Sequence, residues 1–179
     1  MRRRRMPATM KPRSRSTRLR AGMFVVGIAL SVPTWAARES LGTFGGWGAF
    51  RDTMPVRRCF AIAEPVRRGG QRGRAFLGIG YWPDRGVRGQ LQLRLSRRKA
   101  RGTPVVLSAG TRRFALIAGG NAAWAPNARV DAAIVAAIRS ATSLSVEGTG
   151  RDGRAFVDAY ALRGAATAID AAALGCARR

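Results

Sequence analysis

The chain has no histidine, only two cysteines and only nine acidic residues among its 179. The absence of histidine removes the commonest general base and the commonest metal ligand. No activated serine motif and no cluster of metal-ligating side chains stands out either. These absences leave no catalytic constellation to assemble, so we expect a protein that is not an enzyme and holds no cofactor.

Long hydrophobic runs are also missing. The apolar run at residues 21–32 is too short for a membrane-spanning helix, which needs about 20 residues, but it suits the core of a signal peptide. Pro33 ends this run, and Thr34 and Ala36 are small residues at the −3 and −1 positions of a cleavage site. We predict that residues 1–36 are a signal peptide, cut after Ala36 or Ala37. An uncleaved amino-terminal anchor is the alternative.

Charge is abundant and mostly of one sign. The chain carries 33 basic residues and a net charge of +24, and only Lys11 and Lys99 are lysines. Residues 1–36 hold nine of the basic residues and no acid, which leaves 24 basic and nine acidic residues, or +15, for the remainder. A surplus of this size favours polyanionic neighbours such as phospholipid headgroups, anionic polysaccharide or nucleic acid.

After the leader, short apolar runs alternate with turn residues. Residues 87–96 alternate most clearly, and a period of two predicts a strand with one face in water. The glycine-rich residues 37–46 are predicted to be a flexible lead-in to one β-rich domain over 47–179. Further strands are predicted at 47–50, 57–63, 74–82, 104–108, 112–118, 142–149 and 154–162.

Two helices complete the prediction. Asn127 is a candidate N-cap for a helix that ends near Arg139, with apolar residues spaced along one side. A second, alanine-rich helix is predicted over 165–174, and Gly175 would stop it. Strands that follow one another through turns favour antiparallel pairing. The fold class is therefore mainly β, a β-sandwich or rolled antiparallel sheet of roughly seven strands with two short helices.

The two cysteines, Cys59 and Cys176, are predicted to form a disulfide because an exported chain with an even cysteine count usually pairs them. Two unpaired thiols or a redox pair remain the alternatives. Residues 148–153 match the G-x-G-x-x-G pattern of dinucleotide-binding loops. A strand rather than a helix is expected to follow, so we interpret this segment as a glycine-rich hairpin turn. Asp158, inside an apolar strand, is expected to pair with an arginine.

Two arginine-rich loops are the candidate binding residues. Arg67 and Arg68 belong to one loop, and Arg97 and Arg98 belong to the other. They are predicted to contact anionic envelope polymers or a membrane surface, and the alternative is a charged face that is simply solvated. Nucleic acid is not the favoured partner, since an exported protein rarely meets it.

The segment from Phe44 to Pro65 places Trp47 among glycines and then Cys59 at the start of an apolar strand. This pattern resembles the start of the invasion-associated locus B family of exported bacterial proteins. Residues 160–169 resemble that family's closing strand and alanine-rich helix. The resemblance covers roughly residues 44–174. The resemblance implies a periplasmic or secreted, non-enzymatic protein. The alternative interpretation of the chain is a basic polyanion-binding module of the cell envelope.

Overall fold

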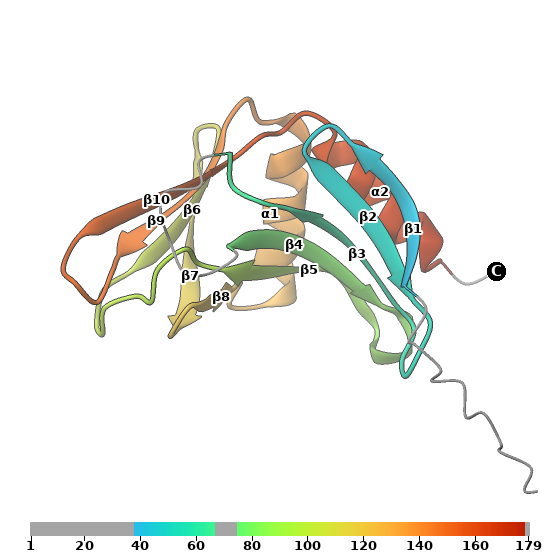
Figure 1. Ribbon diagram of the computed structural model, residues 1–179, viewed down its shortest axis with the longest axis horizontal. Coiled ribbons are helices and arrows are strands. Elements are labelled where there is room, and N and C mark those ends of the chain that lie inside the picture. The colour runs from blue at the N-terminus through green and yellow to red at the C-terminus, as the bar shows by residue number, and fades with distance from the viewer. Residues whose placement is uncertain (1–37, 67–74, 178–179) are drawn as a thin grey trace, which may run out of the picture. The chain divides into compact units, whose positions relative to one another are not determined.

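The strands form one antiparallel sheet that bends around two α-helices (Figure 1). The computed structural model describes residues 38–66 and 75–177, all of which belong to one unit, Thr34–Arg179. The strand order across the sheet is β1-β2-β3-β4-β5-β8-β7-β6-β9-β10. The strands are β1 (Arg38–Phe44), β2 (Trp47–Asp52), β3 (Arg58–Ala63), β4 (Phe76–Trp82), β5 (Val87–Arg94), β6 (Val105–Ala109), β7 (Arg112–Gly119), β8 (Ala122–Trp124), β9 (Leu144–Thr149) and β10 (Ala155–Tyr160).

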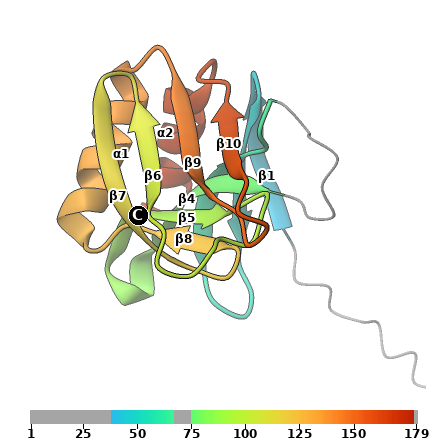
Figure 2. The ribbon, with the colours of Figure 1, turned by 90° about the vertical axis from the view of Figure 1, so that its left-hand side faces the viewer.

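Both helices cover the same face of the sheet (Figures 1 and 2). Helix α1 (Ala128–Ser140) packs against β5, β6 and β7, and helix α2 (Ala165–Gly175) packs against β1 to β4. The Asn127 side chain accepts a hydrogen bond from the backbone N–H of Val130, which confirms the predicted N-cap. The predicted mainly β fold with two short helices is therefore confirmed. Of the two predicted forms, the structure has the rolled antiparallel sheet and not the β-sandwich.

The core lies between the helices and the inner face of the sheet. Strand β5 shows the expected alternation, with buried leucines facing the helices and glutamine and arginine facing outward. A short 3₁₀ turn, η1 (Pro83–Arg85), joins β4 to β5. The largest fully buried side chains are Trp47, Leu77, Ile79, Leu91, Leu107, Ile134 and Ile169.

The prediction that residues 37–46 are a flexible lead-in is wrong for the described part of that segment. Residues 38–44 form β1, which pairs with β2 with one irregularity between Ser40 and Gly42, so the folded domain includes a strand ahead of Trp47. Gly42 misled the prediction because it lies beneath an aromatic ring, and Gly48 in the neighbouring strand β2 lies beneath another. The ring of Phe44 covers Gly42 and the ring of Phe50 covers Gly48, where a Cβ would overlap the ring. Here glycine makes room for a side chain in a strand.

Two long-range connections close the fold around Trp47 and Cys59. The buried Trp47 donates a hydrogen bond from Nε1 to the carbonyl oxygen of Ala161 at 2.7 Å, which ties β2 to the segment before α2. Cys59 on β3 is bonded to Cys176 at the end of α2, with their Cα atoms 5.7 Å apart. The predicted disulfide is therefore present in the structure, and it spans 117 residues of sequence.

Candidate functional site

The connection between β5 and β6 lies against the turn between β9 and β10. Lys99 forms an isolated antiparallel bridge with Gly150. On either side, the N–H of Ala100 donates to the Thr149 carbonyl at 2.8 Å and the N–H of Arg151 donates to the Arg98 carbonyl at 2.9 Å. Backbone hydrogen bonds therefore hold together two loops that are about fifty residues apart in sequence.

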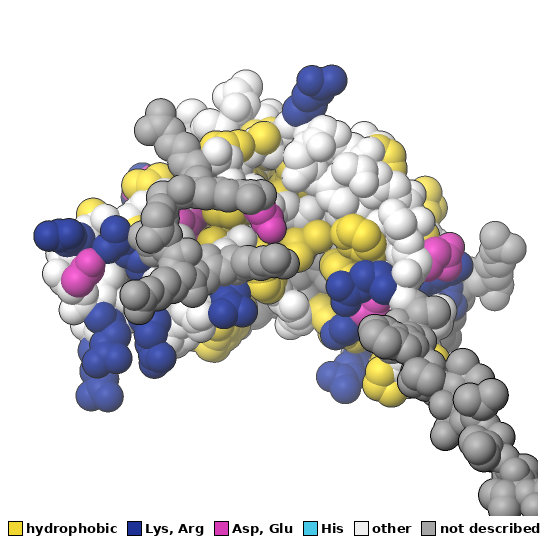
Figure 3. Space-filling view, viewed as in Figure 1, with side chains coloured by type: hydrophobic (Ala, Val, Ile, Leu, Met, Phe, Trp, Pro, Cys, Tyr) yellow, Lys and Arg dark blue, Asp and Glu magenta, His cyan; other side chains and the backbone are white. Residues whose placement is uncertain are grey.

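These two loops gather six cations, which we call the basic cluster. Four of the six side chains are exposed, and one carboxylate, Asp152, pairs with Arg97 at 2.6 Å. Figure 3 shows Lys and Arg side chains concentrated at this end of the molecule, on the left of the view. At physiological salt a charge acts over about 8 Å, so cations must be gathered together before they act as a unit. The basic cluster consists of Arg97, Arg98, Lys99, Arg101, Arg151 and Arg154.

The sequence located only part of this cluster. Arg97 and Arg98 were predicted, whereas Arg67 and Arg68 lie outside the described residues, so their role stays a prediction. Arg151 and Arg154 were missed, although they sit in the G-x-G-x-x-G segment. That segment is the β9–β10 hairpin turn, as expected from the strand that follows it. The pairing of β6 with β9 brings this turn beside the β5–β6 connection. That pairing joins segments far apart in the sequence, so no local sequence pattern predicts it.

Asp158 on β10 makes a hydrogen bond next to the start of the basic cluster. Its buried carboxylate accepts a hydrogen bond from the backbone N–H of Ser96 at 2.9 Å. Pairing with an arginine was the expectation, and the structure corrects it: Asp158 on β10 satisfies a backbone donor where β5 has ended. Ser96 directly precedes Arg97, so this bond helps to fix where the basic segment begins.

A second buried carboxylate has the same role further along β5. Asp131, in the first turn of α1, accepts a hydrogen bond from the N–H of Leu91 at 2.8 Å. Burial raises the pKa of Asp131, and the hydrogen bond from Leu91 only partly offsets that effect. Because β8 pairs with β5 only at Leu93 and Arg94, the rest of that β5 edge needs such partners.

The third buried carboxylate, Asp52, is held by arginines. Arg38 bonds to both carboxylate oxygens, and Arg58 bonds to one of them at 2.8 Å. The hydrogen bond from Arg38, followed by that from Arg58, keeps the pKa of Asp52 below its usual value despite burial. The three buried acids are thus each explained by structure, and no group of three or more metal-ligating side chains occurs within residues 38–66 and 75–177.

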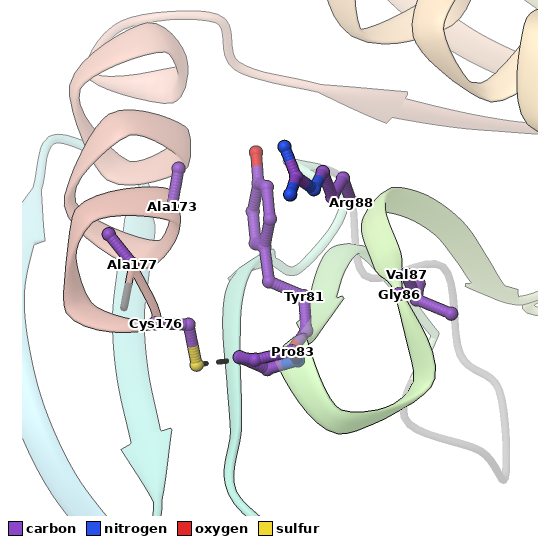
Figure 4. Close-up of a pocket in the computed structure, with 8 residues that line it drawn as sticks. All are labelled: Tyr81, Pro83, Gly86, Val87, Arg88, Ala173, Cys176 and Ala177. Atoms are coloured by element: carbon purple, nitrogen blue, oxygen red, sulfur yellow. Dashed lines mark hydrogen bonds between the residues drawn. The ribbon is translucent and has the colours of Figure 1, made fainter. Parts of the chain in front are cut away.

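A pocket of about 490 Å³ lies between the end of α2 and the β4–β5 hairpin (Figure 4). The ring of Tyr81 stands in it with the Arg88 guanidinium beside its hydroxyl, and Val87, Ala173 and Cys176 supply apolar walls. Burial raises the pKa of Tyr81, and a nearby arginine that is already paired with Asp170 opposes the rise. With Arg88 as the one arginine among the described residues of its lining, this pocket is less suited to a polyanion than the basic cluster.

Comparison of the chain with protein-family models, with curated proteins and with solved structures finds no match. The resemblance to the invasion-associated locus B family therefore stays a prediction. In the part of the chain that the structure describes, neither helix is long and apolar enough to cross a membrane.

Proposed function

We propose that this protein is an exported, non-enzymatic domain of the cell envelope, of the invasion-associated locus B type, which binds anionic envelope polymers through the basic cluster. One observation carries this proposal: the backbone bonds from Ala100 to Thr149 and from Arg151 to Arg98 bring two arginine-rich loops together. Charge that is fixed in place by backbone bonds loses less entropy on binding than charge on separate mobile loops. A solvated surface needs no such arrangement.

Export is supported by the leader and by the cysteine pair. A structural disulfide is typical of proteins in oxidising compartments. Strand β1 begins at Arg38, so cleavage after Ala36 or Ala37 would leave every described strand intact. Mass spectrometry of the envelope fraction should find a new amino terminus at Ala37 or Arg38. An intact Met1 on membrane-bound protein would contradict cleavage.

The binding test compares two variants that lose the same charge from different places. Arg98→Gln with Arg151→Gln removes two cations from the basic cluster, and Arg85→Gln with Arg129→Gln removes two exposed cations elsewhere. Binding to lipopolysaccharide and to vesicles of anionic phospholipid is measured at physiological salt. Since each cation near an anionic surface contributes about 1 kcal/mol, the first variant should bind roughly tenfold or more weakly.

The control variant should bind nearly as the parent protein does. Equal losses in the two variants would mean that net charge alone drives binding, and no binding by the parent protein would leave the charge as a solvated surface. Either result would overturn the proposal. Preference for vesicles over lipopolysaccharide would identify a membrane surface rather than a polymer as the partner.

A further inference from the structure

A groove lies on the outer face of the sheet where β5 and β8 separate. Strand β8 has only three residues and pairs with β5 at Leu93 and Arg94 alone. The hollow beside this short pairing measures about 540 Å³, a size in the usual range of ligand sites. We call it the β5–β8 groove. Its aromatic and polar lining side chains are Phe76, Gln90, Gln92, Arg94, Asn121 and Trp124.

The groove combines two aromatic rings with polar groups that are not used within the fold. Trp124 is 41% exposed, and Phe76 is half-buried on the strand two places away. Phe76 pairs with Arg94 across β4 and β5, which puts both on the outer face. The exposed side chains of Gln90, Gln92 and Arg94 form no hydrogen bond or ion pair within residues 38–66 and 75–177. The site therefore offers stacking faces and free hydrogen-bonding groups together.

The groove runs directly into the basic cluster. The N–H of Leu95 donates to the carbonyl of Asn121, a groove residue, at 2.7 Å. Four residues later the N–H of Lys99, a residue of the basic cluster, donates to the carbonyl of Gly120 at 2.8 Å. The same two segments thus form the end of the groove and the beginning of the cluster. A single extended chain could occupy both.

We propose that the β5–β8 groove binds a segment of acidic polysaccharide. The rings of Trp124 and Phe76 stack on the C–H faces of sugar rings, whose positive edges suit the negative face of an aromatic ring. The amides of Gln90 and Gln92 both donate and accept hydrogen bonds, as neighbouring sugar hydroxyls do. Arg94 pairs with a sugar carboxylate in a two-bond arrangement. This inference rests on the proposed function and names the polymer that the basic cluster binds.

Other polyanions fit the groove less well. A single strand of nucleic acid binds by stacking its bases and by pairing its phosphates along a positively charged groove. Among the described residues that line this hollow, Arg94 is the one cation. A phospholipid surface presents phosphates on a plane and would leave the amides inside a concave groove unused. The described lining, with one cation, three amides and two rings, matches a sugar chain whose hydroxyl groups outnumber its carboxylates.

The experiment titrates the protein with short oligomers of galacturonic acid and with the same oligomers after reduction of their carboxyl groups. Trp124→Ala and Gln92→Ala each should weaken binding of the acidic oligomer, by roughly tenfold for the tryptophan. Val157→Ala, which trims an exposed apolar side chain on β10, should leave binding unchanged. Arg94→Gln should weaken binding of the acidic oligomer but not of its carboxyl-reduced counterpart.

The outcomes separate this inference from the proposed function. If Arg98→Gln with Arg151→Gln weakens binding while Trp124→Ala, Gln92→Ala and Arg94→Gln do not, the cluster binds polyanions and the groove proposal is overturned. If only the groove variants weaken binding, the groove proposal stands and the role of the cluster falls. Tighter binding of a thymidine oligonucleotide or of anionic vesicles than of the acidic oligomer would overturn the choice of polysaccharide. Circular dichroism of each variant confirms that it is folded.

Discussion

At the scale of single residues, Gly164 lies directly against the end of β1. Its φ is 87°, and a Cβ at this position would overlap the carbonyl oxygen of Phe44 at the end of β1. Gly86 in the β4–β5 hairpin has a similar φ of 67°, but a Cβ there would meet nothing within 4 Å. The two glycines therefore share a left-handed backbone and differ in the space around them.

Replacing each of these glycines with alanine separates backbone strain from crowding. Gly86→Ala should lower the free energy of unfolding by about 1–2 kcal/mol, which is the cost of a left-handed backbone at a residue with a Cβ. Gly164→Ala should cost about 1–3 kcal/mol more, because the new methyl group also displaces the backbone of Phe44. The free energy of unfolding in urea measures both. Equal losses in the two variants would show that β1 does not pack against the start of α2.

The two tyrosines predict how stability depends on pH. Burial raises the pKa of both Tyr81 and Tyr160, and the charge of Asp158 adds to the rise for Tyr160. The hydroxyl of Tyr160 has no hydrogen-bond partner in the described part of the chain. Because unfolded tyrosine titrates near pH 10, the folded state keeps more protons above that value, and stability should fall as the pH rises from there.

Absorbance of tyrosinate tests this directly, since Tyr81 and Tyr160 are the only tyrosines of the chain. Near pH ~10 the folded protein should show little tyrosinate, whereas the protein in denaturant should be about half ionised. Half-ionisation of the folded protein at that pH would contradict the burial of both rings.

At the scale of elements, the disulfide joins the third strand to the end of the last helix. In the chain-entropy model a loop of 117 residues is worth about 4–5 kcal/mol. The double variant Cys59→Ala with Cys176→Ala should therefore unfold at a much lower urea concentration than the parent protein. Peptide mapping without reductant should recover the linked pair from exported protein. Two titratable thiols in that protein would refute the pairing.

The elements that the sequence predicted are those with a local cause. Alternation along residues 87–96 and the cap at Asn127 depend on near neighbours, and both are confirmed. Strand β1 was missed because Gly42, Gly45 and Gly46 are typical of a loop, and the packing of Phe44 over Gly42 becomes visible only once the chain is folded. Strand β8 was missed because three residues are too few to show a period.

The candidate site follows the same division. Arg97 and Arg98 stand out in any window of the sequence, whereas Arg151 and Arg154 join them only through the pairing of β6 with β9. The groove depends equally on strand order, because β8 lies between β7 and β5 and so brings Trp124 to the same hollow as Gln92. Strand order is set by contacts between distant segments, and a single sequence does not display it.

At the scale of the whole molecule, the basic residues behind the net charge of +15 outside residues 1–36 have different roles. Arg38 and Arg58 neutralise Asp52, and Arg139 pairs with Asp170, so these cations serve the fold. The basic cluster instead sets six cations against one carboxylate at one end of the sheet. We therefore expect an anionic polymer to bind at this end of the sheet.

The salt dependence of polymer binding tests this account most directly. Each ion pair with a polyanion releases condensed counterions, so the logarithm of the affinity should fall linearly with the logarithm of salt concentration. Oligogalacturonate binding would be measured across a salt series for the parent protein, for Arg98→Gln with Arg151→Gln, and for Arg85→Gln with Arg129→Gln. We predict a steep line for the parent protein, a parallel line for the second variant and a clearly shallower line for the first. Three coincident lines, or an affinity that does not change with salt, would contradict the central claim that the basic cluster binds the polymer.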